Sequence, residues 1–201
     1  MYNIIQYGDF KPLGKVKKKK QIVLCHSSRE ANDYLASLSY RMNSKFEKIP
    51  NFLIKKNGEV FQLLQSVGYS NFFYDSKINQ QSIIIVLENL GWLEKKPLSN
   101  DYINWIGSIY TGKAYEKKWR DYFFWDPYTE HQINQLTEIC VSLCDEFQID
   151  KKCSGHNTKI EGIKNFEGIV SRSNYDSRYT DLNPSFNFEN FLKKIEHERI
   201  L

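Results

Sequence analysis

Two long apolar runs rich in β-branched residues most strongly constrain the fold of this chain. The first run covers residues 21–26 (Gln-Ile-Val-Leu-Cys-His) and the second covers residues 82–89 (Ser-Ile-Ile-Ile-Val-Leu-Glu-Asn). A strand with one solvated face alternates polar and apolar residues, whereas a strand buried on both faces reads as a continuous apolar run. Because such a sheet must be covered on each side, the two runs predict the central strands of an α/β protein.

Apolar residues recur at helical spacing in three other segments, residues 29–42, 128–147 and 188–198. The predicted buried stripes are Ala31, Tyr34, Leu35, Leu38 and Met42, then Ile133, Leu136, Cys140, Leu143 and Phe147, then Phe191, Leu192 and Ile195. Side chains at these intervals share one helix face, so each segment is expected to pack that face on a sheet. Ser27 or Ser28 is expected to cap the first helix and Thr129 the second.

A β-hairpin is predicted over residues 50–64, where two apolar runs flank Asn57-Gly58. This dipeptide readily supplies the positive φ angles of a tight turn. Residues 168–170 (Gly-Ile-Val) add a further short strand. The expected fold is therefore a mixed central sheet flanked by helices on both faces, forming one domain over residues 1–201.

Residues 100–127 carry many aromatic side chains without a clean period. These are Tyr102, Trp105, Tyr110, Tyr115, Trp119, Tyr122, Phe123, Phe124 and Trp125. One interpretation is an aromatic cover that closes one side of the core. The other is a wall on which a ligand stacks, with Trp119 and Trp125 in contact with that ligand.

The charge pattern argues against a nucleic-acid polymer as partner, because a formal net charge of +4 is small for a chain with 26% charged residues. The lysines of residues 15–20 form either a solvated approach to a strand or a patch for phosphate or an anionic wall polymer.

The four cysteines contain no Cys-x-x-Cys pair, which favours a reducing compartment. No signal-peptide or membrane-spanning pattern is present, so we expect a cytoplasmic protein without a membrane partner.

The loop over residues 168–186 has the composition of a site rather than of a packing element. A polar run without helical or alternating period follows the short strand, and Asn183-Pro184 closes it as a turn. Binding and catalytic residues concentrate on loops held by a rigid scaffold. Arg172, Tyr179 and Asp181 are the side chains that this loop is expected to present.

Taken in order, five segments of the chain resemble the type 2 N-acetylmuramoyl-L-alanine amidases, which share their fold with the peptidoglycan recognition proteins. The segments are Ile22–Ser27, Asn51–Leu63, Ser82–Leu93, Tyr128–Ile133, and Gly168–Asn174 with Asp181–Pro184. The resemblance implies a zinc hydrolase that cuts the amide between muramic acid and the first alanine of the stem peptide. Such a site needs three protein ligands and one open position for water.

The resemblance also indicates where the chemical residues should stand. The first ligand position falls at Cys25, with His26 beside it, the second at Arg172 and the third at Asp181. The acid/base glutamate position falls at Val86, a tyrosine position at Pro50 and a lysine position at Tyr179. Only Asp181 keeps the chemistry of the family.

An arginine stays cationic and cannot coordinate zinc, so Arg172 is expected to pair with Asp181 in place of the metal. The expectation is a protein without catalytic residues and without a cofactor, which binds a peptidoglycan fragment or another anionic small molecule such as a nucleotide signal. The candidate ligand-binding residues are Cys25, Asn51, Arg172, Tyr179, Asp181, Trp119 and Trp125.

Several alternatives remain open on the sequence. A zinc site could be rebuilt from Cys25 or His26 with His156 and Asp181, since Gly155-His156 resembles a ligand motif. Cys25 could act as a nucleophile, although His26 should face the opposite side of the strand. Either route would give an active amidase with an unorthodox site, of the phage endolysin type. A protein-binding or immunity module is the third class, because a fold does not determine a function.

Overall fold

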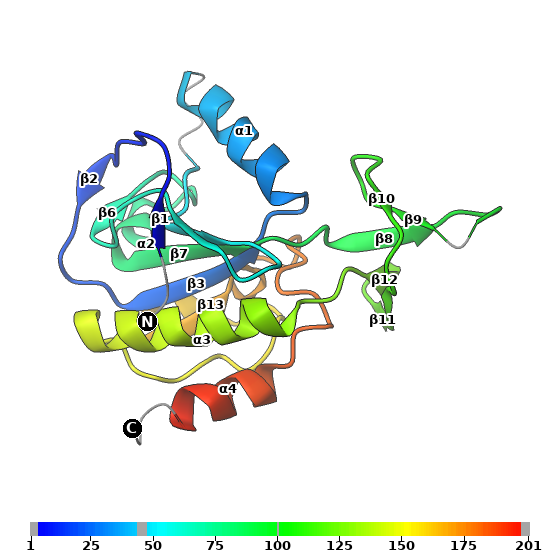
Figure 1. Cartoon of the computed structure of the whole chain (residues 1–201). Coiled ribbons are helices and arrows are strands. Elements are labelled where there is room, and N and C mark those ends of the chain that lie inside the picture. Colours follow the sequence, from blue (N-terminus) through cyan, green and yellow to red (C-terminus); the bar gives the residue numbers. More distant parts are fainter. Residues whose placement is uncertain (1–3, 44–47, 100, 198–201) are drawn as a thin grey trace.

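The computed structural model describes residues 4–43, 48–99 and 101–197 (Figure 1). Its centre is a six-stranded sheet in the order β1-β5-β4-β7-β3-β13. The strands are β1 (Ile4–Gln6), β5 (Val60–Gln62), β4 (Phe52–Ile54), β7 (Ser82–Leu87), β3 (Gln21–His26) and β13 (Gly168–Ser171). The strands β4, β7, β3 and β13 run parallel to one another, and β5 is antiparallel to β4. The predicted central strands are confirmed, because β3 and β7 are buried along their whole length.

Helices cover both faces of this sheet, as the continuous apolar strands predicted. On one face, α3 (Glu130–Phe147) packs on the side chains of Ile22 and Leu24, and α4 (Phe188–His197) lies against α3. On the other face, α1 (Ala31–Asn43) packs on Val23 and Cys25. Alternate residues of one strand thus enter two separate cores. Met42 lies within α1, but its side-chain packing and residue 198, the predicted end of the last helix, lie outside what the structure describes.

The start of α1 differs from the prediction that Ser27 or Ser28 caps it. The backbone N–H of Ala31 donates instead to the Glu88 carboxylate at 2.8 Å, and the other oxygen of Glu88 accepts from the N–H of Lys56. Ser28 itself has a φ of 59°, which is outside the extended region of a helix cap. A carboxylate from the end of β7 therefore fixes both the helix start and the hairpin turn.

The Thr129 cap of α3 is confirmed. The Thr129 hydroxyl accepts from the backbone N–H of Gln132, and the Gln132 side chain accepts from the N–H of Thr129. This reciprocal arrangement satisfies two donors that the first helical turn leaves free.

The predicted hairpin is present as β4 and β5, but its turn is one residue longer than an Asn-Gly turn. The N–H of Gly58 donates to the carbonyl of Lys55, and the N–H of Lys55 donates to the carbonyl of Glu59. Gly58 alone has a positive φ, of 88°. The loop is thus a three-residue connection in which glycine, without a Cβ, takes the left-handed position.

The aromatic segment forms a second sheet, which corrects the interpretation as a cover over the core. Its five antiparallel strands, in the order β10-β9-β8-β12-β11, are Ile109–Tyr110, Tyr102–Ile103, Trp92–Lys95, Tyr122–Trp125 and Tyr115–Trp119. Figure 1 shows this sheet in green, projecting from the central sheet at the side where β7 ends. Trp125 is its buried centre, with 0% of its surface exposed.

The lysine run is neither wholly solvated nor a continuous cationic patch. Lys19 is buried, and its Nζ donates to the carbonyls of Gln80 and Ser82 at 2.9 and 3.3 Å, while burial lowers its pKa to about 8. Lys20 forms an ion pair with Glu167 at 2.5 Å. The first lysine of the run, Lys15, belongs to β2 (Gly14–Lys15), which pairs with β6 (Gly68–Tyr69).

Among the described residues, no helix combines the length and the apolar character that crossing a membrane requires. The remaining helical elements are short: α2 (Ser76–Gln81) precedes β7, and the 3-10 turns η1 (Ile163–Asn165) and η2 (Arg172–Asn174) flank β13.

Candidate functional site

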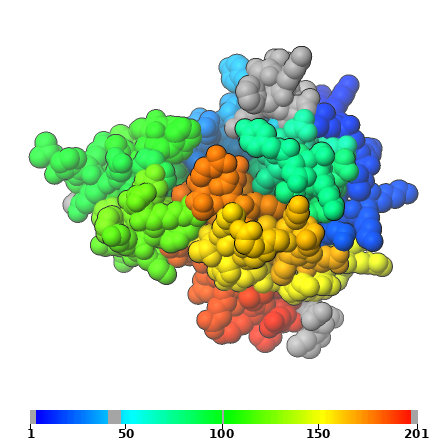
Figure 2. Space-filling view, turned by 180° about the vertical axis from the view of Figure 1, so that it is seen from behind, coloured from blue at the N-terminus to red at the C-terminus, as the bar shows by residue number. Residues whose placement is uncertain are grey.

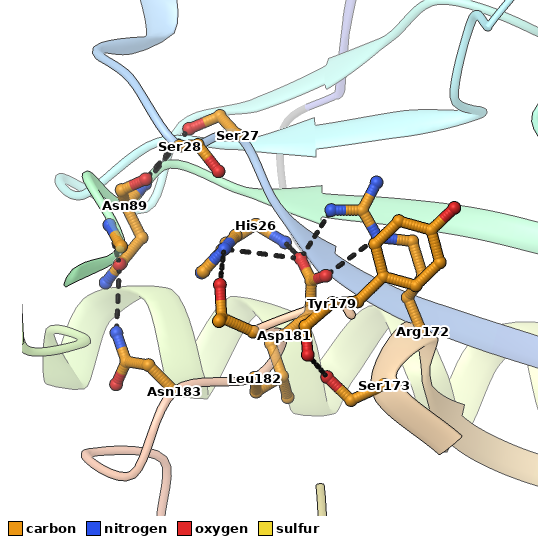
Figure 3. Close-up of polar contacts among 12 residues, drawn as sticks. His26, Ser27, Ser28, Asn89, Arg172, Ser173, Tyr179, Asp181, Leu182 and Asn183 are labelled. Atoms are coloured by element: carbon orange, nitrogen blue, oxygen red, sulfur yellow. Dashed lines mark hydrogen bonds and ion pairs between the residues drawn. The ribbon is translucent and has the colours of Figure 1, made fainter. Parts of the chain in front are cut away.

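The loop that begins at Arg172 lies beside the carboxyl end of β3. The parallel register aligns Ser171 of β13 with Leu24 of β3, so the residues that follow each strand leave the sheet at the same edge. The carboxyl edge of a parallel sheet is where open α/β folds place their ligands. Figure 3 shows Arg172, Tyr179 and Asp181 gathered at this edge with His26.

Arg172 and Asp181 form a bidentate ion pair. The Arg172 Nε donates to Asp181 Oδ2 at 2.7 Å, and Nη2 donates to Oδ1 at 3.0 Å. Oδ1 also accepts from the backbone N–H of His26 at 2.6 Å. The pair that the sequence suggested is therefore present, and it ties the loop to the end of β3 with the planar fork geometry that arginine and carboxylate share.

The electrostatics of this pair favour both charges. Burial raises the pKa of Asp181, but the charge of Arg172 and the bonds from Arg172 and His26 outweigh it, so the net pKa lies below its ordinary value. Burial would lower the pKa of Arg172, yet Asp181 holds it above its ordinary value. Asp181 is 0% exposed, so its ionised form depends on these donors.

The guanidinium of Arg172 also contacts two aromatic rings. Its central carbon lies 4.4 Å from the ring centroid of Tyr179 and 6.0 Å from that of Phe72. The Arg172 side chain keeps 22% of its surface exposed, and its Nη1 donates to no partner among the described residues. The outer edge of the guanidinium is therefore a donor that points away from Asp181 (Figure 3).

Three buried polar residues hold the loop in this shape. The Ser171 hydroxyl donates to the carbonyl of Asp181, and the Ser173 hydroxyl donates to the carbonyl of Tyr179 at 3.0 Å. The Asn174 side chain accepts from the N–H of Ser171 and donates to the carbonyl of Thr158. The position of Tyr179 and Asp181 is thus set by bonds within the loop, in addition to the ion pair.

His26 is a buried neutral imidazole rather than an ion-pair partner. Its Nε2 lies 3.6 Å from Asp181 Oδ1, but burial lowers its pKa below the ordinary value despite the attraction of Asp181. The Tyr128 hydroxyl and the Thr180 hydroxyl each lie 3.5 Å from a ring nitrogen. His26 therefore fills the edge of the sheet on the α3 side, opposite to Cys25, as strand alternation requires.

Cys25 and Val86 lie in the apolar core under α1. Cys25 is 0% exposed and pairs in register with Val86, which is 1% exposed. Burial is the main cause that raises the pKa of the Cys25 thiol far above its ordinary value. A thiol that stays protonated is a poor nucleophile, so this environment does not fit the reading of Cys25 as a catalytic group.

Besides Cys25 and Asp181, two more of the candidate ligand-binding residues are inaccessible to solvent. Asn51 is 2% exposed, and its amide bonds the carbonyls of Gln65 and Gly68 and the N–H of Ile84. Trp125 is fully buried and donates to the carbonyl of Lys117. These side chains brace the backbone, so the expectation that they contact a ligand does not fit their burial.

His156 does not join the other residues of the fallback zinc set. It is exposed, and its Nδ1 contacts the hydroxyl of Thr158 in its own loop at 2.8 Å. Across residues 4–43, 48–99 and 101–197, no group of three or more His, Cys, Asp and Glu side chains is placed to hold a metal ion. The predicted ligand residues thus converge only as the pair of Arg172 with Asp181, beside His26.

A buried polar network next to the site was missed by the sequence reasoning. The Asn183 side chain donates to Asn89 Oδ1 and to the carbonyl of Asp126, and Asp126 accepts from Lys56 Nζ at 2.7 Å. Burial raises the pKa of Asp126, and Lys56 acts against that effect. Asn89 and Asn183 lie at the ends of motifs that the sequence did highlight, but their contacts cross 94 residues of chain.

Arg120 also approaches the loop, at the tip of the β11–β12 hairpin, and no sequence pattern pointed to it. Its Nη1 donates to the carbonyl of Ser177, and its guanidinium carbon lies 4.3 Å from the ring centroid of Trp119. Trp119, one residue of the aromatic wall proposed from sequence, thus stacks on an arginine that contacts the loop.

The comparisons with known proteins agree with this architecture. The profile of the N-acetylmuramoyl-L-alanine amidase family matches residues 16–165, which include Cys25, His26 and Val86 and end before Arg172. No curated protein sequence matches the chain.

Solved structures of amidases share the fold over nearly the whole chain. LysC from Clostridium intestinale URNW has a TM-score of 0.59 at 10% identity and covers 98% of this chain and 99% of its own. Staphylococcus aureus AmiA in complex with its ligand has a TM-score of 0.58 at 9% identity, covering 100% and 83%. AmiD from E. coli, in complex with an anhydro-muramoyl peptide substrate, has a TM-score of 0.51 at 16% identity, covering 90% and 59%. The family match, which spans most of the sequence, establishes that this chain belongs to the N-acetylmuramoyl-L-alanine amidase family.

Proposed function

We propose that this protein is an amidase-fold binder that holds an anionic ligand and does not hydrolyse it. The observation that carries this proposal is the bidentate ion pair of Arg172 and Asp181 at the carboxyl edge of the central sheet. In that position an active member of the family needs metal ligands. Asp181 is the only one of these positions that keeps the residue type of the family. Its carboxylate is already bonded to the permanently charged guanidinium of Arg172.

The donor set around Asp181 does not suit zinc. Both carboxylate oxygens already accept from Arg172, and Oδ1 accepts in addition from the His26 backbone. A zinc ion would have to displace a cation and would then find a buried apolar thiol and an arginine where two more ligands belong. We therefore derive no catalytic step through a metal.

The accessible edge of Arg172 supports the binding function. An arginine fork matches carboxylate and phosphate oxygens, and the Tyr179 ring holds the guanidinium plane in place. Two related proteins have been solved in complex with muramoyl peptides: AmiD from E. coli and AmpDh3 from Pseudomonas aeruginosa. We infer a peptidoglycan fragment as the ligand, with a nucleotide signal as the other anionic small molecule to be tested.

The test is isothermal titration of a muramoyl peptide and of a cyclic nucleotide into wild type and into Arg172→Gln/Asp181→Asn. This double variant keeps a hydrogen-bonded pair and the net charge of the protein. A bond to a charged group contributes about 1.5–3 kcal/mol, so the variant should bind the true ligand at least about tenfold more weakly.

The matched control for this titration is Lys193→Gln, which removes a cation on exposed α4 that pairs with Glu189. Its affinity should equal that of wild type. Binding that survives unchanged in Arg172→Gln/Asp181→Asn would remove Arg172 from the ligand site. Hydrolysis of the muramoyl peptide by wild type would replace the proposal with an unorthodox amidase.

A further inference from the structure

The hairpin tip at Arg120 carries a second stacked arginine that faces the same loop as Arg172. Arg120 lies between Trp119 and Asp121 in the two-residue connection from β11 to β12, and its φ is 57°. A side chain of this size rarely adopts the left-handed region, where glycine and asparagine are favoured. The backbone thus holds Arg120 in an unusual conformation that brings its side chain to the loop.

Contacts on both sides fix the Arg120 guanidinium. One face lies 4.3 Å from the Trp119 ring centroid, and Nη1 donates to the carbonyl of Ser177 in the middle of the Arg172–Asp181 segment. The Nε and Nη2 groups of Arg120 donate to no partner in the described part of the chain. Arg120 therefore resembles Arg172, which stacks on Tyr179 and leaves Nη1 unpaired.

The two carboxylates of this loop pair with other arginines rather than with Arg120. Asp181 neutralises Arg172, and Asp176 pairs with Arg178 at 2.5 Å. Arg120 has no carboxylate in direct contact, although Asp181 and Asp176 attract it from a greater distance. Figure 2 shows the orange loop segment reaching the surface directly beside the green second sheet.

We propose that Arg120 is a second anion-binding residue at this loop, so that an anionic ligand meets the free edge of Arg172 and the free edge of Arg120. This inference rests on the proposed binding function. Guanidinium groups held by aromatic rings lose little entropy on binding and supply charge-assisted bonds to carboxylate or phosphate oxygens. The second sheet would then contribute Trp119 and Arg120 as one wall of the site.

The test compares Arg120→Asn with Arg178→Asn by titration of inorganic phosphate, acetate and a muramoyl peptide, followed by ¹⁵N resonances of the arginine Nε groups. Asparagine tolerates a positive φ, so Arg120→Asn keeps the turn while removing the guanidinium. Arg178 is an exposed arginine on the same loop whose charge Asp176 already neutralises, so Arg178→Asn controls for general electrostatics.

We expect Arg120→Asn to weaken binding of phosphate and of the muramoyl peptide at least about tenfold, with Arg178→Asn within about twofold of wild type. In wild type, the Nε resonances of Arg120 and Arg172 should shift together during the titration. The phosphate and acetate arms decide which oxyanion the pair prefers.

Three outcomes separate this inference from the proposed function. Equal weakening in both variants, or a muramoyl peptide that shifts only Arg172, would overturn the role of Arg120 and leave the binding function standing. Phosphate binding through both arginines without muramoyl-peptide binding would support the anion site and exclude the peptidoglycan ligand. If none of the three probes shifts the Nε resonance of Arg120, Arg120 does not bind an anion.

Discussion

At the scale of single residues, the buried carboxylate of Asp181 depends on Arg172. Asp181 is 0% exposed and accepts two bonds from that guanidinium. Removing one partner of a buried pair leaves an uncompensated charge, which typically costs about 3–5 kcal/mol. Arg172 is therefore a structural clamp as well as a candidate ligand contact.

The first prediction follows from this dependence. Arg172→Ala should lower the free energy of unfolding by about 3–5 kcal/mol, and adding Asp181→Asn should recover most of the loss, because the amide needs no counter-charge. Urea denaturation of the three proteins measures both values. If the single and the double variant are equally destabilised, the charge of Asp181 is not what Arg172 balances.

The second prediction concerns pH. The pKa of Asp181 is lower in the folded protein than its unfolded value of about 3.9, so its contribution to stability is complete above that pH. As the pH falls below about 4 towards the folded pKa, the carboxylate becomes protonated and this contribution is lost.

Arg172→Gln/Asp181→Asn has no titrating carboxylate at this position and serves as the reference. Its unfolding free energy should fall less steeply than that of wild type as the pH decreases below about 4, in denaturation series at fixed salt. Parallel curves for the two proteins would contradict an ionised, clamped Asp181.

Only some features of the candidate site could be predicted from the amino-acid sequence. The pairing of Arg172 with Asp181 was predictable because the opposite charges fall at two ligand positions of one loop. The burial of Asn51 was not, since its partners Gln65, Gly68 and Ile84 follow only from the packing of the hairpin against β7. Arg120 gave no signal, because its role arises from a turn conformation.

At the scale of elements, the strands with continuous apolar runs and the helices with apolar stripes were predictable, while the connections between them were not. The start of α1 is the clearest case. The sequence offers two serines at the expected cap, but Glu88, 57 residues away, provides the acceptor for Ala31. Because the acceptor comes from a residue that is distant in the sequence, no local sequence pattern indicates this helix cap.

The third prediction tests this cap. Glu88→Ala should destabilise the protein by about 1–3 kcal/mol, because two backbone N–H groups lose their buried acceptor. Amide hydrogen exchange should accelerate at Ala31 and Lys56 in particular.

Ser28→Gly is the matched control for the cap, because glycine suits the positive φ of this residue. It should leave exchange at Ala31 unchanged and alter stability by less than about 1 kcal/mol. Fast exchange in Ser28→Gly together with slow exchange in Glu88→Ala would return the capping role to the serine.

The second sheet escaped prediction for a physical reason. Its strands are two to five residues long, and the register between β11 and β12 shifts between Glu116 and Trp119. Such an irregularity breaks the alternation that identifies a strand. The aromatic residues therefore indicated burial, but not the surface against which they pack.

At the scale of the whole molecule, the candidate site is formed by the central scaffold and by one addition to it, the projecting second sheet. The central sheet and its helices match amidase structures over almost the full chain, although identity to them is 10% for LysC and 9% for AmiA. The scaffold places the loop at the carboxyl edge of the central sheet, beside the end of β3. The projecting sheet adds Trp119 and Arg120 beside that loop.

We propose that this edge binds an anion at the positions where the resemblance to the amidase family implies metal ligands. This proposal depends on two residues, Cys25 and Arg172, which stand at expected zinc-ligand positions of an otherwise conserved fold. Under this proposal, Arg172 holds a peptidoglycan fragment at this edge and the protein does not hydrolyse it.

Cleavage of a muramoyl peptide at saturating zinc tests this claim most directly, with the released stem peptide followed by mass spectrometry and an active amidase as positive control. We predict that the muramoyl peptide stays intact in the presence of the protein, with or without EDTA. Release of the stem peptide that EDTA abolishes would show that zinc chemistry survives and would contradict the account.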